Sequence, residues 1–592
     1  MVIAYIIFLF GIFGQLRIGV FAIFFLGLVL YLWGGYRLFK KSQFKESIFE
    51  LLKAFFLFFL FVVAIAFLNK GMCAHSWDEF SHWADVVKAM FYIDDFATNP
   101  LSFSRFKDYP PGMPLLQYSY LVLNSLIHGN KNFDEWRLFF VSHIVLFSLF
   151  FPLLDMRKNK KIETVCIIGA VVFSAVFFFS YIFDSLYIDP YVSVVASFLM
   201  CNIMFSMDKD RIYDLSVIFG CAFLVILKDV GILFAFICCT VYIFEKSRRE
   251  KKLLNKLFSI FPIISTFGTK LLWTWKLNHD SVNKNFSGKI DFVEFFKLLI
   301  YKNGDDYKQS VVNSAIDAFF VKRFSIGSIS LSYFNILLIA FICVCVCLVF
   351  CVIKRIGKFD LINVSVCYIV STLVPVLYAV FIGAMYAYKF TEYEAIHLAS
   401  YERYMNMCFL FYLIVSLITL FFFAYDFKSN SLMDLVFVLF FVLFINNSSI
   451  SNYINRNNII KGQEFRGKYV QLVDSINSCC DETSVISILS RGDTGLDRYV
   501  MRYYCRPNVV NINLGYSLGG PAFDGDVWYT DISPDDYMNS LIDNGITHVA
   551  IVQSREDFID NYGVIFENPN DIEANTLFWV DVNNRRLVKC DI

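Results

Sequence analysis

The sequence predicts an α-helical polytopic membrane protein with about thirteen transmembrane helices and a C-terminal extracytoplasmic α/β domain. Hydrophobic residues make up 57% of the 592 residues and charged residues only 18%, whereas an ordinary soluble chain carries roughly 25% charge. Apolar runs long enough to cross a bilayer recur between residues 2 and 448, and residues 450–592 have a different, more polar composition. Disorder, a collagen-like repeat and a secreted disulfide scaffold are excluded, and 52 basic against 52 acidic residues give no reason to expect a nucleic-acid partner.

A crossing helix needs about 20 mostly apolar residues. The first predicted span is short, but it lacks the basic start and small-residue cleavage site of a signal peptide, so it is kept as a helix. The thirteen predicted spans cover residues 2–15, 17–36, 50–69, 136–155, 162–183, 188–206, 212–228, 230–246, 255–276, 328–353, 360–387, 405–425 and 430–448.

Clusters of Lys and Arg give the orientation, because such residues collect in cytoplasmic loops. With the N-terminus in the cytoplasm, the basic turns at 37–45, 157–161, 209–211, 246–256 and 354–358 all lie inside. Residues 112–128 are apolar enough to cross, but a crossing there would invert every later loop. We therefore expect them to form a helix at the outer interface, where Tyr118 and Tyr120 fit. This orientation places the loops at 70–135 and 277–327 and the C-terminal tail outside the cytoplasm.

The chain divides into a transmembrane domain at 1–449 and an α/β domain at 450–592. Short β-like runs occur in the tail at 484–489, 547–552 and 577–582, with a helical stretch at 537–543 between two of them. Strands alternating with helices predict a small α/β domain. Four of the sixteen cysteines, Cys479, Cys480, Cys505 and Cys590, lie in this tail, where an oxidising compartment permits disulfides of unspecified connectivity.

An acidic pair, Asp78-Glu79, follows the third span directly and is flanked by Trp77 and Trp83. Removing a carboxylate from water at the lipid–water boundary costs free energy, so two acidic residues at this position require an explanation. One interpretation is a solvated, acidic start of an outer loop. The other is a partly dry pocket holding a carboxylate of shifted pKa, as a general base requires.

Histidines near this pair raise the question of a metal. Asp78 and His82 are four residues apart and would share one helical face. In the zinc-protease pattern, however, a Glu directly follows the first His of the motif, and here His75 is followed by Ser76. No metal ligand is assigned.

Two motifs together resemble a known family. The segment at 77–80 (WDEF) and the segment at 109–114 (YPPGMP) lie in the first large outer loop. This arrangement resembles GT-C glycosyltransferases, in particular bacterial enzymes similar to protein O-mannosyltransferases and to the aminoarabinose transferase of lipid A. The resemblance covers the architecture of residues 50–450. Two additional helices before the acidic loop depart from it, and no motif names the sugar.

The resemblance implies a GT-C fold and an inverting hexosyl- or pentosyltransferase of the bacterial cytoplasmic membrane. A polyprenyl-phosphate-linked sugar would be the donor, and a glycan, lipid or protein of the cell envelope would be the acceptor. Asp78 would be the catalytic base, and Glu79 would orient the acceptor or share that role. Some GT-C enzymes use a divalent cation and others do not, so no cofactor is assigned.

Cations are expected to meet the charge of the leaving lipid phosphate. Lys228 lies beside Asp229 in a tight outer turn, where the alternative is a mutual ion pair that caps the turn. Arg403 precedes the twelfth span and suits bidentate phosphate binding, although it and the neighbouring tyrosines also fit a role as interfacial anchors. Arg105 is a third candidate.

Further polar and aromatic side chains of the outer segments are candidates for substrate binding. Asp189 is one of them, although the favoured explanation for it is an N-terminal helix cap. The whole set is Trp77, His82, Tyr109, Asp189, Tyr401 and Glu402.

Two other functions compete with single-sugar transfer. A polysaccharide polymerase or ligase would move whole glycan units from a lipid diphosphate and would have the same architecture. A lipid-linked sugar transporter or flippase would place polar groups near the bilayer midplane, whereas the middles of these helices are nearly free of charge.

Overall fold

The chain folds into two compact units, and each is described by itself. Unit 1 comprises Met1–Leu68, Asp108–Gln117 and Phe139–Asn455, and unit 2 comprises Asn69–Lys107, Tyr118–Leu138 and Arg456–Ile592. The computed structural model describes residues 1–39, 44–149, 169, 174–206, 209–283, 290–302, 305–326, 329–354, 360–426, 447–481, 483–511 and 513–590.

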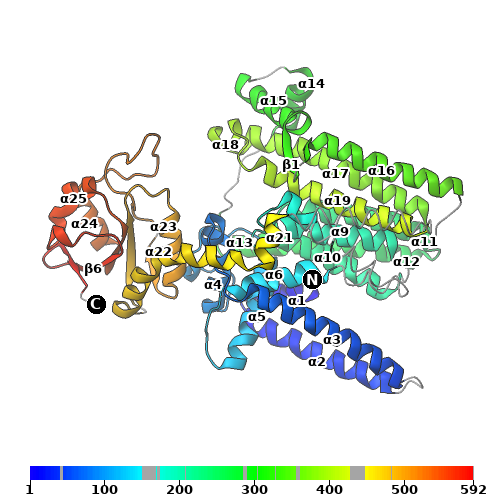
Figure 1. The fold of residues 1–592 in the computed structure, drawn as a ribbon, viewed down its shortest axis with the longest axis horizontal. Coiled ribbons are helices and arrows are strands. Elements are labelled where there is room, and N and C mark those ends of the chain that lie inside the picture. Colours follow the sequence, from blue (N-terminus) through cyan, green and yellow to red (C-terminus); the bar gives the residue numbers. More distant parts are fainter. Residues whose placement is uncertain are drawn as a thin grey trace. The chain divides into compact units, whose positions relative to one another are not determined.

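Unit 1 is helical, as its composition predicts (Figure 1). Helix α5 (Gly112–His128) and helix α6 (Trp136–Ser148) begin in one unit and end in the other. The other helices are α1 (Val2–Ile12), α2 (Leu16–Phe39), α3 (Phe44–Asn69), α9 (Asp189–Phe205), α10 (Arg211–Leu227), α11 (Gly231–Arg249), α12 (Leu253–Leu257), α13 (Phe261–His279), α14 (Phe292–Tyr301), α15 (Asp306–Phe320), α16 (Tyr333–Lys354), α17 (Leu361–Tyr388), α18 (Glu392–Ile396), α19 (Tyr401–Asp426) and α21 (Ser448–Ile454).

Five helical segments among the described residues are long and apolar enough to cross a membrane, so the protein is a membrane protein. They are Leu16–Arg37, Leu253–His279, Tyr333–Ile353, Leu361–Tyr388 and Tyr401–Phe423. Half of the span predicted at 162–183 and most of the span predicted at 430–448 lie outside the described residues, as do the basic turn at 157–161 and all but the first residue of the turn at 354–358. The count of thirteen spans therefore stays a prediction.

Small and hydroxylated residues let the helices of unit 1 pack closely. Ser193 and Ser197 of α9 donate hydrogen bonds to the carbonyl oxygens of Met407 (2.6 Å) and Phe411 (3.3 Å) on α19. Bonds of this kind hold helices together where lipid offers no polar partner. In Figure 1, α16, α17 and α19 run side by side.

The second predicted outer loop, 277–327, is ordered in its described parts. Asp291 and Asp305 are the N-cap residues of α14 and α15, and their side chains accept hydrogen bonds from backbone N–H groups of the first turn. A two-stranded antiparallel hairpin, β1 (Arg323–Ile326) and β2 (Ile329–Ser332), then leads into α16.

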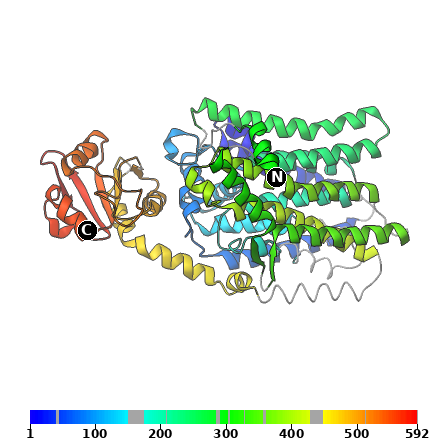
Figure 2. The same cartoon turned by 90° about the horizontal axis from the view of Figure 1, so that it is seen from above.

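Unit 2 combines the first outer loop with the tail. The loop contributes a π-helical turn, η1 (Glu79–Trp83), helix α4 (Ala84–Ile93) and a 3₁₀ turn, η2 (Pro100–Ser102). The tail contributes α22 (Asn457–Cys479), an uninterrupted helix drawn in yellow in Figure 2, and then α23 (Leu496–Cys505), α24 (Pro534–Asp543) and α25 (Glu556–Tyr562).

A five-stranded sheet forms the centre of the tail. Its order is β4 (Val509–Asn511), β3 (Val485–Ser490), β5 (His548–Gln553), β6 (Thr576–Asp581) and β7 (Arg586–Lys589). The first three strands are parallel and the last two pairings are antiparallel. The strands predicted at 484–489, 547–552 and 577–582 thus form within one residue of their predicted bounds.

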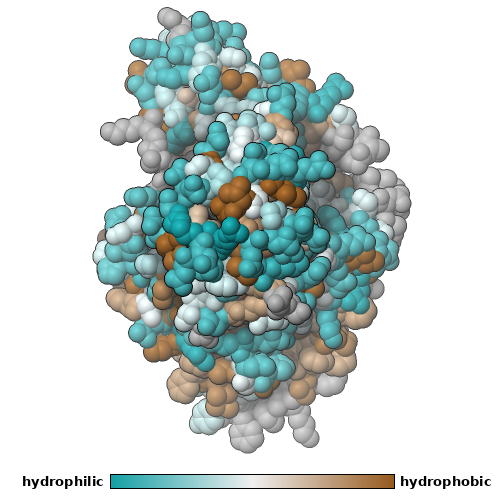
Figure 3. Space-filling view, turned by 90° about the vertical axis from the view of Figure 1, so that its left-hand side faces the viewer, coloured by the Kyte–Doolittle hydropathy of each residue, from teal (hydrophilic) through white to brown (hydrophobic). Residues whose placement is uncertain are grey.

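The sheet buries its apolar side chains under α24 and α25. Phe558, Phe566 and Phe578 lie in one apolar cluster, and each is at most 3% exposed. The face shown in Figure 3 is largely hydrophilic, with a few hydrophobic residues among the polar ones. A buried core below a hydrophilic surface is what a domain in water requires. The predicted domain bounds, 1–449 and 450–592, stay a prediction.

Candidate functional site

The acidic pair stands at the start of η1, in unit 2. Asp78 is the residue immediately before this π-helical turn, and Glu79 is its first residue. Asp78 is half-buried, whereas Glu79 is fully buried. Water and a dissolved substrate therefore reach Asp78 more readily than Glu79. Single π-turns are rare and occur frequently at functional sites.

Glu79 holds the backbone ahead of the turn. Its Oε2 accepts hydrogen bonds from the N–H groups of His75 and Ser76, each at 2.9 Å. Burial raises the pKa of Glu79, and these two donors oppose that rise by stabilising the carboxylate. These two hydrogen bonds to Glu79 Oε2 fix the backbone of the loop that carries Asp78.

Trp77 borders the acidic turn on its exposed side. Its ring is 37% exposed and packs edge-on against Tyr499 of α23, with ring centres 5.5 Å apart. Gly495, which has a φ of +98°, lies beneath the Trp77 ring, and a Cβ there would be 3.3 Å from the indole. Glycine is required by that backbone angle, and it also lets the tail approach the tryptophan closely.

His82 is buried in the same turn and forms an aromatic pair with Trp83, with ring centres 4.2 Å apart. Arg105 is exposed, farther along the loop. The structure thus places Trp77, Asp78, Glu79, His82 and Arg105 in unit 2.

A buried ion cluster joins the acidic loop to the tail helix α23. The carboxylate of Asp85 lies 2.9 Å from Arg502 and 2.9 Å from Arg506, and it also accepts a hydrogen bond from Ser104 at 2.8 Å. Asp85 and Arg502 are at most 1% exposed. Burial raises the pKa of Asp85, but the two guanidinium groups outweigh it and hold that pKa below its usual range. Sequence reasoning missed this cluster, because its members are about 420 residues apart.

The predicted phosphate ligands of unit 1 come together around one carboxylate. Lys228 Nζ lies 2.6 Å from Asp189 Oδ1, and Arg403 also interacts electrostatically with Asp189. The Lys228 side chain is 19% exposed, whereas that of Asp189 is 1% exposed. Two cations thus interact with one buried carboxylate near the end of α10.

Two tyrosine rings complete this cluster. The Arg403 guanidinium carbon lies 5.3 Å from the ring centre of Tyr187 and 5.4 Å from that of Tyr404. Lys228 Nζ lies 5.8 Å from the same Tyr404 ring. Aromatic faces hold cations at such distances. We call Lys228, Arg403, Asp189, Tyr187 and Tyr404 the cation cluster.

The structure decides between two alternatives that the sequence left open. Lys228 does not pair with its neighbour Asp229, which instead binds Lys270 of α13. Asp189 is the first residue of α9, and its carboxylate binds Lys228; the residue at the cap position is Ile188. Both residues therefore belong to a tertiary ion cluster.

The proline motif positions the cation cluster. Gly112, at the start of α5, lies so close to the end of α10 that a Cβ there would be 2.7 Å from the carbonyl oxygen of Ile226 and 2.9 Å from Leu227 Cα. Asp108, which precedes the motif, accepts a hydrogen bond at its carbonyl oxygen from Trp273. The motif thus braces the turn from which Lys228 extends.

Three predicted substrate ligands lie apart from the cluster's carboxylate. Tyr109 is half-buried within the proline motif. Tyr401 is buried and donates a hydrogen bond to the carbonyl oxygen of Ala315 at 3.3 Å. Glu402 is exposed and pairs with Lys322 at 2.9 Å. The last two stabilise α15 and the adjoining loop.

Within the described part of the chain, no group of three or more His, Cys, Asp or Glu side chains is arranged to hold a metal ion.

No family model and no curated protein sequence matches the chain. Solved structures match the chain. The chain is similar to ArnT. The apo structure of ArnT from Cupriavidus metallidurans matches with a TM-score of 0.40 at 13% identity, covering 88% of this chain and 96% of that chain. The structure of the same enzyme bound to undecaprenyl phosphate matches with a TM-score of 0.39 at 13% identity, covering 90% and 97%. ArnT is a GT-C aminoarabinose transferase, the kind of enzyme that the two motifs resemble.

Proposed function

We propose that the chain is an inverting GT-C glycosyltransferase that transfers a sugar from a polyprenyl phosphate to an acceptor of the cell envelope. The reaction would take place at the outer face of the bacterial cytoplasmic membrane, with the N-terminus in the cytoplasm and the tail outside. The motifs at 77–80 and 109–114 support this proposal, as does the apolar composition of the helices.

The cation cluster is the observation that carries the proposal. Lys228 and Arg403 are 175 residues apart in the sequence, yet Lys228 pairs with Asp189 and Arg403 interacts electrostatically with the same carboxylate. A lipid phosphate needs such a cationic partner at the membrane surface, and Arg presents the planar donors that match phosphate oxygens.

In the proposed reaction the acceptor hydroxyl oxygen attacks the anomeric carbon of the donor sugar. The new carbon–oxygen bond forms as the bond from that carbon to the phosphate oxygen breaks, which inverts the configuration. Asp78 takes the hydroxyl proton, and the polyprenyl phosphate leaves with its negative charge stabilised by Lys228 and Arg403.

Glu79 acts in this proposal through the backbone. Its carboxylate already accepts the N–H groups of His75 and Ser76, so we assign it the positioning of Asp78. Trp77, which is partly exposed beside Asp78, supplies an aromatic surface for a sugar ring.

The test is sugar transfer by the full-length protein in lipid nanodiscs. Purified protein is incubated with a panel of radiolabelled polyprenyl-phosphate sugars and a membrane extract as the source of acceptor. We expect label to enter the acceptor, and Asp78→Asn to lower the rate by about 10²–10⁴-fold, because general-base catalysis is lost.

Asp134→Asn is the matched control, since Asp134 is another acid of the same loop and pairs with Arg137 at the surface. Full activity of Asp78→Asn would remove Asp78 from the role of base. Transfer only from lipid-diphosphate glycans would replace the proposal by the polymerase or ligase alternative.

A further inference from the structure

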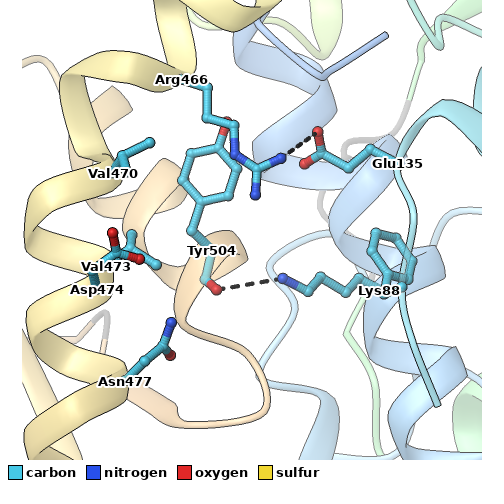
Figure 4. Close-up of a pocket in the computed structure, with 9 residues that line it drawn as sticks. Lys88, Glu135, Arg466, Val470, Val473, Asp474, Asn477 and Tyr504 are labelled. Carbon is cyan, nitrogen blue, oxygen red and sulfur yellow. Dashed lines mark hydrogen bonds and ion pairs between the residues drawn. The ribbon is translucent and has the colours of Figure 1, made fainter. Parts of the chain in front are cut away.

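A cavity of about 190 Å³ lies within unit 2, and neither Asp78 nor any residue of the cation cluster lines it (Figure 4). It is several times larger than the roughly 30 Å³ of one water molecule and smaller than the 300–1,000 Å³ of pockets for drug-sized ligands. It therefore has room for one small polar group. Its polar lining consists of Lys88, Glu135, Arg466, Asp474 and Asn477.

One wall of the cavity is a face of α22. Arg466, Val470, Asp474 and Asn477 follow each other at intervals of four, four and three residues, so a single face of the helix presents them. The opposite wall comes from α4, through Lys88, and from the segment before α6, through Glu135 (Figure 4). All of these elements belong to unit 2.

Lys88 is held rigidly in the wall. Its Nζ donates hydrogen bonds to the carbonyl oxygens of Tyr503 (2.6 Å) and Tyr504 (3.4 Å), and it lies 4.7 Å from the centre of the Tyr503 ring. Burial lowers the pKa of Lys88 to about 8, which keeps most of the amine cationic at neutral pH. A fixed ammonium of this kind is a preorganised hydrogen-bond donor.

The facing ion pair is open. Arg466 Nη1 lies 3.8 Å from Glu135 Oε2, which is beyond hydrogen-bond distance. Glu135 Oε2 is buried and has no hydrogen-bond partner among the described residues, so it can accept a hydrogen bond from a ligand hydroxyl. The guanidinium also lies 5.1 Å from the ring centre of Tyr504.

The charges of the lining decide the class of ligand. Lys88 and Arg466 are balanced by Glu135 and Asp474, so the cavity has no net charge to attract an anion such as phosphate. A purely apolar ligand would leave these charged groups desolvated without partners. Hydroxyl groups both donate and accept hydrogen bonds and so complement a mixed lining, and Phe133 with Val470 gives an apolar wall for the C–H face of a ring.

We propose that this cavity binds one neutral sugar residue of the acceptor glycan. Identifying this sugar as part of the acceptor rests on the proposed function, but binding of a sugar in this cavity does not depend on sugar transfer. It assigns the α/β tail a part in recognising the acceptor, through the face of α22.

The test measures binding directly. Full-length protein in nanodiscs is titrated with glucose, galactose, mannose and N-acetylglucosamine, observed by saturation-transfer difference NMR, and with inorganic phosphate, observed by ³¹P line broadening. Two exposed lining residues are replaced, Asp474→Asn and Asn477→Leu. Glu464→Gln and Gln471→Leu are the matched controls, because they are exposed on the same helix and do not line the cavity.

At least one sugar is expected to bind, and each lining variant is expected to weaken its affinity about tenfold, as the loss of one hydrogen bond to a hydroxyl does. The control variants are expected to bind as the wild type does, with unchanged thermal unfolding in all four. Absence of sugar binding, equal effects of lining and control variants, or phosphate binding that the lining variants abolish would each overturn the proposal. Sugar binding without any transfer would instead contradict the proposed function.

Discussion

The role of Lys228 is indicated by its tertiary partner and not by its neighbour in the sequence. In the sequence it stands next to Asp229, and a local ion pair explains it fully. In the structure it lies 2.6 Å from Asp189, a carboxylate that is 1% exposed, and retains 19% of its own exposure. A cation anchored in this way can meet a ligand without moving.

Lys228→Gln is expected to weaken binding of undecaprenyl phosphate by at least tenfold, because a charge-assisted hydrogen bond is lost. Binding is measured with the protein in nanodiscs and the labelled lipid. Lys270→Gln is the control, since Lys270 pairs with Asp229 in the neighbouring turn. Lys228→Arg should restore binding, and equal affinities of the Lys228→Gln and Lys270→Gln proteins would contradict the assignment.

Asp493 in the tail titrates in the opposite sense to most surface acids. Burial and the charge of Asp497 raise the pKa of Asp493 to about 6, above its unfolded value of about 3.9. The folded state therefore binds a proton more tightly than the unfolded state, and the contribution of this group to stability falls as pH rises from about 4 to about 6.

Asp493→Asn is accordingly expected to stabilise the tail at pH 8 by about 1–3 kcal/mol, a range that allows for partial solvent screening, and to have little effect at pH 4. The measurement is denaturant unfolding followed by tail fluorescence at both pH values. Asp481→Asn is the control, because neighbouring hydroxyls lower the pKa of Asp481. Destabilisation by Asp493→Asn at pH 8 would contradict this interpretation.

At the scale of elements, the proline motif makes a contact between two helices, and the residue responsible is not one of its prolines. The three prolines draw attention in the sequence, but Gly112 makes the contact, because only a residue without Cβ fits against the carbonyl oxygen of Ile226. The start of α5 therefore touches the end of α10, one residue before Lys228.

Gly112→Ala is expected to destabilise the protein by about 1–3 kcal/mol, as overpacking against backbone does, and to weaken donor binding by displacing Lys228. Thermal unfolding and lipid-phosphate affinity are measured together. Gly268→Ala serves for comparison, because a Cβ at this position of α13 meets no atom within 4 Å; equal effects of the two substitutions would count against the brace.

Helices and strands were predictable where composition or the period of the hydrophobic residues determines them. The apolar helices and three of the five strands of the tail were visible in the sequence, because long apolar runs and β-branched runs have few other solutions. Strands β4 and β7, of three and four residues, are too short to carry a pattern. The sequence also named Lys228, Arg403 and Asp189 singly, but their meeting depends on how the ends of α9, α10 and α19 pack, which no local pattern encodes.

At the scale of the whole molecule, the acidic loop is built partly by the tail. Asp85 of the loop binds Arg502 and Arg506 of the tail, and the sequence offers no signal for this pairing across 417 residues. The loop and the tail accordingly form one compact unit that the chain leaves and re-enters.

Asp85→Asn is expected to cost about 3–5 kcal/mol, since it leaves two buried guanidinium groups without their charge partner. Asp571→Asn, which breaks an exposed pair with Lys589, should cost less than about 1 kcal/mol. Unfolding of the full-length protein by denaturant compares the two. Equal stability of both variants would show that the buried cluster contributes no more than a surface pair.

The Asp85 cluster also sets an order of events during synthesis. A ribosome adds roughly 5–20 residues per second, so the 417 residues between Asp85 and Arg502 occupy about 20–80 s. Throughout that interval the nascent loop holds a carboxylate whose counter-ions do not yet exist, and its mature form must await the last stretch of translation. Premature termination anywhere before residue 502 would therefore leave the loop of Asp78 unfinished, although every residue of that loop had long been translated.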